Sequence, residues 1–167
     1  VRAIIGQQVS VAGARTLAGR LAAALGEPVT TPFAGLTTVF PGPERVAGLP
    51  VERLAALGLI RSRAAAVLAL ARAIRDGEIR LSPQADVATT LDALRRLPGI
   101  GDWTAQYIAM RALAWPDAFP HTDLGVKKAC ATDNAKAILA RAEAWRPWRA
   151  YAVMHLWRAL AGVPPNP

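Results

Sequence analysis

The sequence predicts an all-α fold, and three observations support this prediction. Of the 167 residues, 53% are hydrophobic and 19% are charged, a balance typical of a folded core and not of a disordered tail. Alanine and leucine dominate, and runs of β-branched or aromatic residues are nearly absent, so helix is favoured over strand. Apolar residues also recur at helical spacing between glycine and proline breaks.

The first half of the sequence predicts four helices, with one long connector between the first and the second. Ser10 is placed to cap the first of them, and Gly26 to end it. The proline-rich stretch 27–43 predicts the connector. Gly77 ends the last helix of this half. The helices are expected over residues 11–25, 44–47, 51–57 and 61–75.

The second half predicts a further series of helices separated by proline and glycine. One helix runs from Ala85 to the break at Pro98, and another resumes at Asp102 and ends before Trp115-Pro116. The proline-rich tail 163–167 is expected to be loose. After the break at Pro98 the expected helices span residues 102–114, 124–130, 134–144 and 147–161.

Cysteine content and charge exclude several classes of protein. The single cysteine, Cys130, excludes a disulfide framework and any four-cysteine zinc or iron–sulfur site supplied by this chain alone. No apolar stretch approaches the roughly 20 residues of a membrane span, so no membrane partner is expected. Twenty Lys plus Arg against twelve Asp plus Glu give a net charge of +8, which favours a polyanionic partner. We expect a cytoplasmic protein.

The run Leu97-Pro98-Gly99-Ile100-Gly101 predicts a tight turn between two helices. Glycines permit unusual backbone angles and leave backbone amides uncovered at the start of the next helix. Such amides, together with the helix dipole, bind a phosphate oxygen and position DNA without reading its sequence. The alternative is a glycine-rich turn between helices that binds no ligand.

Three separated motifs extend this interpretation along the chain. They are VRAIIGQQVS at residues 1–10, LPGIGDWTA at 97–105, and WRPWRAYA followed by HLW within 145–157. With them the sequence resembles the helix-hairpin-helix DNA glycosylases, most closely the bacterial 3-methyladenine DNA glycosylase II (AlkA-type) branch. The resemblance covers nearly the whole chain.

The resemblance implies a helix-hairpin-helix DNA glycosylase fold with two helical subdomains and the active-site cleft between them. The first subdomain is expected over residues 1–116, with the hairpin at about 90–114, and the second over 117–167. The small β-rich domain that precedes this region in relatives is expected to be absent from this chain. The implied activity is base-excision repair, by hydrolysis of the N-glycosidic bond of alkylated bases such as 3-methyladenine and 7-methylguanine in duplex DNA.

Asp123 matches the catalytic aspartate of this family. When a glycosidic bond breaks, the deoxyribose develops oxocarbenium character, which a fixed carboxylate in a dry site stabilises. The carboxylate can also orient or deprotonate the attacking water. The structural alternative is an N-cap for the helix that begins at Leu124, and the two roles are compatible. Asp117 is the nearest competing acid, but it does not match the family position.

Trp103, Tyr107 and Trp157 match positions that line the base pocket in this branch. Aromatic faces suit a flipped, cationic alkylated purine, although large aromatics at helical spacing are usually core residues. Trp103 also stands where bifunctional relatives have the Schiff-base lysine, so hydrolysis without a lyase step is expected. The remaining tryptophans are interpreted as core residues: Trp115, Trp145 and Trp148.

The resemblance also implies a set of DNA contacts and an ion site. Gln8 falls where relatives insert a wedge into the duplex, but its polar amide departs from the aliphatic residue found there. Asp102 is a second departure from the family pattern, because a neutral or basic residue would better suit a nearby phosphate. It is interpreted as a cap of the second hairpin helix. The expected DNA contacts are Gly99, Ile100, Gly101, Thr104, Gln7 and Gln8. A monovalent cation, sodium or potassium, is expected on the backbone carbonyls of Arg95, Leu97 and Ile100, and no other cofactor is required.

Two other functions stay open at this point. The chain could be a non-enzymatic DNA-binding module of a larger repair or regulatory protein, although such a module needs no base pocket. It could also be a glycosylase for deaminated or oxidised bases. The preferred interpretation is a monomeric, bacterial, nucleoid-associated glycosylase whose partner is double-stranded DNA that contains alkylated bases.

Overall fold

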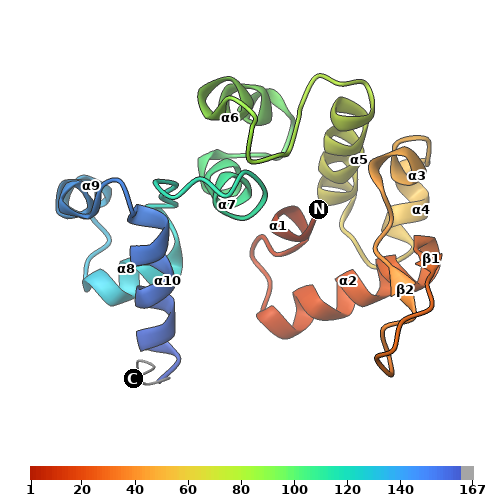
Figure 1. The fold of residues 1–167 in the computed structure, drawn as a ribbon, viewed down its shortest axis with the longest axis horizontal. Helices are drawn as coiled ribbons and strands as arrows, with labels where there is room; N and C mark the ends of the chain where they lie inside the picture. Colours follow the sequence, from red (N-terminus) through yellow and green to blue (C-terminus); the bar gives the residue numbers. More distant parts are fainter. Residues whose placement is uncertain (163–167) are drawn as a thin grey trace. The chain divides into compact units, whose positions relative to one another are not determined.

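The computed structural model describes residues 1–162 and confirms the all-α prediction (Figure 1). Within that range the secondary structure consists of α-helices, one short 3-10 helix and one pair of two-residue strands. The tail 163–167, predicted to be loose, lies outside the described residues. Residues 1–80 and 92–100 form one compact unit, and residues 81–91 with the chain from Gly101 onward form another. The subdomain boundary near residue 116 stays a prediction.

The first unit is organised around a long central helix, α5 (Arg61–Arg75), which begins and ends where the sequence predicts. Its alanine-rich buried faces pack against α3, α4 and α1, because small side chains allow these helices to approach closely. Large apolar side chains such as Ile4, Leu21 and Leu54 fill the remaining core. The elements of this unit besides α5 are α1 (Arg2–Ile5), α2 (Val11–Leu25), β1 (Glu27–Pro28), β2 (Thr38–Val39), α3 (Pro43–Ala47) and α4 (Val51–Ala55).

The cap of α2 is confirmed, whereas its surroundings contain two elements that the sequence pattern does not predict. Ser10 Oγ accepts the backbone N–H of Gly13 at 3.1 Å, which satisfies a donor that the helix itself leaves unpaired. The helix α1 was not predicted. The expected connector 27–43 contains the antiparallel pair β1–β2. A Cβ on Gly26 would lie 2.5 Å from the Val39 carbonyl oxygen. The glycine that ends α2 therefore also lets β2 pack close to the end of this helix.

The helix α6 (Val87–Arg96) crosses from the second unit into the first. It begins two residues later than expected, because Asp86 caps it by accepting the N–H of Thr89 at 2.8 Å. The other elements of the second unit are α7 (Asp102–Ala112), α8 (Leu124–Cys130), α9 (Ala135–Ala142), the 3-10 helix η1 (Glu143–Trp145) and α10 (Arg149–Leu160).

Several helix ends in the second unit differ from the sequence prediction. The helix α7 ends at Ala112 and not at residue 114, because Ala114 adopts a left-handed conformation with φ 53°. The chain tightens into η1 after Ala142, so α9 is shorter than predicted. The last helix, α10, begins at Arg149 and not at residue 147. It packs against α8, and this pair frames the site described next.

Candidate active site

Asp123 lies at the N-cap of α8, as the sequence predicts. Its Oδ1 accepts the backbone N–H of Val126 at 3.0 Å, and its own N–H donates to the Pro120 carbonyl at 2.9 Å. The cap interpretation of this residue is therefore confirmed. Capping fixes the direction of the carboxylate, because one oxygen is bound to the first turn of the helix.

Two tryptophan side chains bind the same carboxylate. Trp103 Nε1 on α7 donates to Asp123 Oδ2 at 3.0 Å, and Trp157 Nε1 on α10 donates to Oδ1 at 2.8 Å. These residues lie 20 and 34 positions from Asp123 in the sequence. The folding of α7, α8 and α10 therefore brings both indoles to one carboxylate.

The aromatic rings predicted to line a base pocket form one continuous group in the second unit. Tyr107 stacks on Trp103 with ring centroids 5.4 Å apart and an interplanar angle of 24°. Its centroid lies 6.1 Å from that of Trp157, with the rings tilted by 37°. All three side chains are half-buried. We call Asp123, Trp103, Tyr107 and Trp157 the Asp123 cluster. Its members lie together, and their roles in catalysis and base binding stay predictions.

All three hydrogen-bond donors to the Asp123 carboxylate within the described part of the chain are neutral N–H groups. The ion pairs of the same residues in this unit involve Asp102, Asp117, Asp133 and Glu143, and none of them involves Asp123. Neutral donors orient a carboxylate and leave its charge uncompensated. An uncompensated negative charge in a half-buried site interacts strongly with a cation that forms nearby, because the local dielectric constant is lower than that of water.

Asp117, the competing acid in the sequence, has different surroundings. It is 8% exposed, and Arg149 binds it through two guanidinium contacts, Nε to Oδ1 at 2.6 Å and Nη2 to Oδ2 at 2.7 Å. Arg146 donates to the same Oδ2. Burial raises the pKa of Asp117, but the hydrogen bonds and charges of Arg149 and Arg146 outweigh it and hold the pKa below its usual value. Glu143 joins this group through Arg146.

The hairpin turn lies where the sequence places it. Leu97 and Ile100 are joined by a backbone hydrogen bond of 3.2 Å, and Gly99 between them has φ 77°, a left-handed angle that favours glycine. A Cβ on Gly99 would lie 3.0 Å from Ala66 Cβ on α5, so glycine also permits this close packing. Gly101 is the exposed N-cap of α7 and has open space around its Cα.

The two glutamines predicted to contact DNA follow α1. Gln7 Nε2 donates to the Gly99 carbonyl at 2.9 Å, which ties this segment to the hairpin turn within the first unit. Gln8 is exposed and has a left-handed φ of 51°, which is uncommon for a residue with a side chain. The insertion of Gln8 into a duplex stays a prediction.

Other residues of the predicted hairpin site are less accessible than expected. Thr104 is 2% exposed and Ile100 is 4% exposed, so neither side chain lies at the surface. Any DNA contact at these two positions rests on backbone groups. The prediction that Asp102 caps α7 is wrong: Gly101 is the N-cap, and Asp102 is the first helical residue, with Oδ2 3.7 Å from His121 Nδ1.

The expected cation site consists of backbone oxygens at Arg95, Leu97 and Ile100. The Leu97 carbonyl already accepts the Ile100 N–H, which occupies one of its two lone pairs. Oxygen donors of this kind suit a hard monovalent cation, so the residues fit the expected group, and the site stays a prediction. Among the described residues, no three His, Cys, Asp or Glu side chains gather where they could hold a metal ion.

The interpretation of all other tryptophans as core residues is wrong for Trp148. Trp148 is 57% exposed and makes an edge-to-face contact with Tyr151, which is 58% exposed. It precedes α10, on the turn where the chain leaves η1. Trp145 is half-buried, with its ring edge-on to that of the buried Phe119. Trp115 is also half-buried.

Sequence reasoning missed two residues that shape the Asp123 cluster. Gln106 Oε1 accepts the Phe119 N–H at 3.0 Å, so α7 holds the loop that leads to Asp123. Gly125 lies so close to Trp157 and Asp123 that a Cβ there would overlap both. A signal for Gly125 exists in the sequence, because glycine is an unfavourable residue within a helix and needs a steric or conformational reason.

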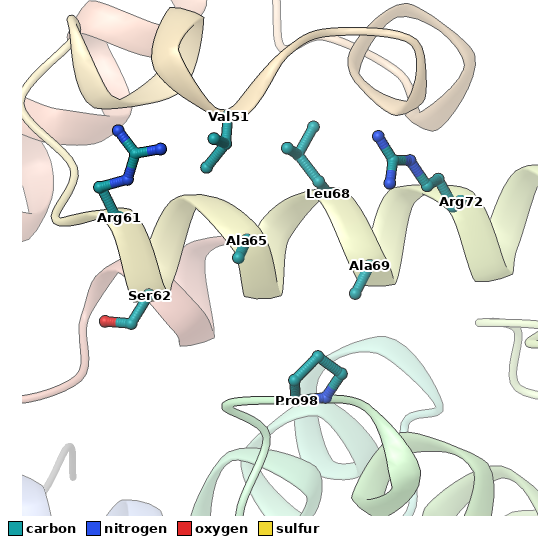
Figure 2. Close-up of a pocket in the computed structure, with 8 residues that line it drawn as sticks. All are labelled: Val51, Arg61, Ser62, Ala65, Leu68, Ala69, Arg72 and Pro98. Carbon is teal, nitrogen blue, oxygen red and sulfur yellow. The ribbon is translucent and has the colours of Figure 1, made fainter.

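A separate groove runs along α5 in the first unit. Figure 2 shows Val51 on one side of α5 and Pro98 of the hairpin turn on the other, with Ala65 and Ala69 on the helix between them. Arg61 and Arg72 also line this groove. Arg61 is paired with Glu52 at 2.7 Å, and Arg72 Nε donates to the Ala47 carbonyl at 2.9 Å. None of its lining residues is a predicted site residue.

No described helix is long and apolar enough to cross a membrane.

Comparison with known proteins defines the class of this chain. Residues 1–149 match the model of the HhH-GPD superfamily of base excision DNA repair proteins, and the chain belongs to this superfamily. The resemblance inferred from the three motifs is therefore confirmed, as is the helix-hairpin-helix glycosylase fold class.

Individual relatives refine this assignment. The chain is 41% identical over 164 residues to the "probable bifunctional transcriptional activator/DNA repair enzyme AlkA" of Mycobacterium tuberculosis, covering 96% of this chain and 32% of that protein. It is 39% identical over 157 residues to DNA-3-methyladenine glycosylase 2 of Escherichia coli, covering 94% and 55%. A solved 3-methyladenine DNA glycosylase from Archaeoglobus fulgidus superposes with a TM-score of 0.80 at 27% identity, covering 93% and 55%. The chain thus spans one third to about half the length of these relatives.

Proposed function

We propose that this chain excises alkylated bases, of the 3-methyladenine and 7-methylguanine type, from double-stranded DNA by hydrolysis of the N-glycosidic bond. The single observation that supports it most is the Asp123 carboxylate, held by two indole N–H groups and a helix N–H, next to stacked aromatic rings. The names of the Escherichia coli and Archaeoglobus fulgidus relatives, both 3-methyladenine DNA glycosylases, support the same lesion class.

The proposed chemistry follows from the charge at Asp123. The bond between the sugar C1′ and the base nitrogen breaks, the electron pair leaves with the base, and positive charge develops on the sugar. Asp123 stabilises that charge, a water molecule adds to C1′, and the Asp123 carboxylate accepts the proton that this water loses. An alkylated purine is already cationic and becomes neutral as it leaves, so no protein acid is required.

The aromatic rings of the Asp123 cluster are proposed to receive the extruded base. A cationic purine is attracted to the electron-rich face of an indole or phenol ring, which an ordinary purine is not. This preference supports alkylated bases over oxidised or deaminated ones, since those are not cationic. With Trp103 and no lysine at that position, the proposed reaction has no Schiff-base step and leaves the DNA backbone intact.

The proposed DNA contacts are backbone groups of the hairpin turn together with the segment at Gln7 and Gln8. The backbone amides near Gly99 and Gly101 suit phosphate oxygens, and a cation on the nearby carbonyls would add positive charge there. A monomer would suffice, since the Asp123 cluster is drawn from one chain.

Base release from methylated duplex DNA tests the proposal. Wild-type protein is expected to release free 3-methyladenine, and Asp123→Asn to release it at least about 100-fold more slowly, because the stabilising charge is lost while the side-chain shape is kept. Asp133→Asn is the matched control, because Asp133 is an exposed acid whose ion pair, with Lys127 at 3.8 Å, lies outside the Asp123 cluster. Wild type that releases no base, or an Asp123→Asn variant as active as wild type, would contradict the assignment.

Two further readouts separate the proposal from the non-enzymatic binding module. The product strand should be abasic but uncut, and borohydride should trap no covalent adduct. A DNA-binding module without enzymatic activity would bind the same duplexes and leave every base in place.

The hairpin contact has its own test, Gly101→Ala. A methyl group at Gly101 meets nothing within 4 Å in the described protein, and φ is −84°, so the fold should tolerate it. A phosphate approaching the exposed amide would meet that methyl group. Affinity for damaged and undamaged duplexes should therefore fall together, by roughly three- to tenfold, as loss of one hydrogen bond implies. A loss confined to damaged DNA would contradict a phosphate contact.

A further inference from the structure

Gly125, the second residue of α8, occupies a position where no larger residue fits without movement. A Cβ at this position would lie 2.7 Å from Trp157 Cδ1, 2.9 Å from Trp157 Nε1 and 3.0 Å from Asp123 Oδ1. Nε1 and Oδ1 are the two atoms joined by the hydrogen bond of 2.8 Å between these side chains. The missing side chain therefore leaves room for this particular hydrogen bond.

Backbone conformation does not explain the glycine. Gly125 is not one of the glycines with a positive φ, and it lies within a helix, where glycine is less favourable than alanine by about 1 kcal/mol. Alanine would thus suit the backbone better. The reason for glycine at this position is steric, and it comes from α10, whose Trp157 crosses over the first turn of α8.

The consequence concerns the direction of the carboxylate. Oδ1 accepts two N–H groups, from Val126 and Trp157, whereas Oδ2 accepts one, from Trp103, among the described residues. An oxygen with two donors has both lone pairs engaged, so Oδ2 is the oxygen with a lone pair available to a sugar or a water. If Trp157 moves away, Oδ1 loses one of its two donors, and the carboxylate is held less firmly, by the Val126 and Trp103 N–H groups alone.

We propose that Gly125 is a positioning residue that acts through Trp157: by having no side chain, it lets the Trp157 indole fix Asp123 so that Oδ2 faces the reacting sugar. The proposal rests on the proposed function in one respect, that Asp123 stabilises the charge that develops during base release. The steric part is independent of it and concerns only the contact among these three residues.

Gly125→Ala tests the proposal, with Gly19→Ala as the matched control. Gly19 is also a glycine within a helix, in α2, but a Cβ there meets nothing within 4 Å. In single-turnover base release, Gly125→Ala should be slower by roughly ten- to a hundredfold, since a small misplacement of a catalytic group costs that much, with affinity for the duplex unchanged within about twofold. Gly19→Ala should match wild type in both.

A second variant distinguishes positioning from a general structural role. Trp157→Ala removes both indole atoms that a Cβ on Gly125 would meet. In the Trp157→Ala background, Gly125→Ala should therefore slow base release by less than about twofold, because the two changes act on one contact. An equal loss in both backgrounds would overturn the proposal. So would unfolding of Gly125→Ala that Trp157→Ala does not relieve, because the glycine would then be required by α8 itself.

A readout without DNA separates this proposal from the proposed function. The indole N–H of Trp157, identified in an NMR spectrum by its absence in Trp157→Phe, should exchange slowly with solvent in wild type and at least about tenfold faster in Gly125→Ala, because its hydrogen bond is weakened. Unchanged exchange would overturn the steric claim. If wild type releases no base while exchange responds as expected, the proposed function fails and the contact stands.

Discussion

Asp117 and Asp123 are six residues apart in the same compact unit, yet their carboxylates are bound by opposite kinds of donor. Asp117 is held by the guanidinium groups of Arg149 and Arg146, which cancel its charge. Asp123 is held by two indole N–H groups and one backbone N–H, which carry no net charge. Both carboxylates are firmly oriented. The charge of Asp117 is balanced by its arginines, whereas the charge of Asp123 is not balanced by any of these three donors.

The difference shows that two acids in the segment 117–123 have different roles, one in stability and the other in the proposed chemistry. A carboxylate paired with two arginines joins distant parts of the chain, since Arg146 and Arg149 precede and begin α10. A carboxylate bound only by neutral groups contributes less to stability, but it stabilises a cation that forms beside it. Local sequence does not reveal the side-chain donors of the two acids, because these donors lie 20 to 34 residues away.

The largest expected effect on stability is at Asp117. Asp117→Ala removes the carboxylate that accepts both hydrogen bonds of the buried Arg149 and leaves Arg146 paired with Glu143, and it should lower the free energy of unfolding by about 3 kcal/mol. Asp123→Ala should cost about 1 kcal/mol, the usual value of an N-cap. Urea unfolding monitored by circular dichroism measures both. Equal losses at the two positions would remove the distinction between them.

The pH dependence of stability sharpens the Asp117 side of the comparison. The net pKa shift of Asp117 is downward from its ordinary value of 3.8, because Arg149 and Arg146 outweigh the opposing effect of burial. A lowered pKa in the folded state means that the stabilisation is complete above pH 3.8 and is lost as pH falls through the folded-state pKa. The stability gap between wild type and Asp117→Ala should therefore shrink in that acid range. A gap that widens there would contradict the ion-pair account.

A smaller effect is expected from one of the indole donors of Asp123. Trp103→Phe keeps an aromatic face for stacking but removes the Nε1 donor to Oδ2, so base release should slow by about tenfold, as loss of one hydrogen bond to a charged group implies. Unfolding free energy and duplex affinity should change little. Single-turnover kinetics beside a binding titration decide the point, and an affinity loss with an unchanged rate would assign Trp103 to binding alone.

Much of the local structure could be predicted from sequence because local interactions determine it. The Ser10 cap, the full extent of α5 and the Asp123 cap follow from residues within four positions of one another. The strand pair β1–β2 could not be predicted, because its strands are two residues long and depend on the close approach at Gly26. Trp148 was misassigned because its helical spacing suggests a core position, whereas it lies on a turn before α10.

The Asp123 cluster was predictable in its members but not in its contacts. The family resemblance names Asp123, Trp103, Tyr107 and Trp157, and four-residue spacing alone places Trp103 and Tyr107 on one helix face. That both indoles donate to the carboxylate depends on how α7, α8 and α10 pack, which no local pattern contains. The close approach at Gly125 belongs to the same packing.

In the proposed function, the negative charge of Asp123 accelerates bond cleavage and contributes little to DNA binding. The most direct test of this claim compares wild type and Asp123→Asn on one duplex with a single 3-methyladenine, measuring the release rate with protein in excess and the equilibrium affinity. The rate should fall at least about 100-fold while the affinity stays within about threefold. An affinity that falls as far as the rate, or a rate that does not fall, would contradict the claim.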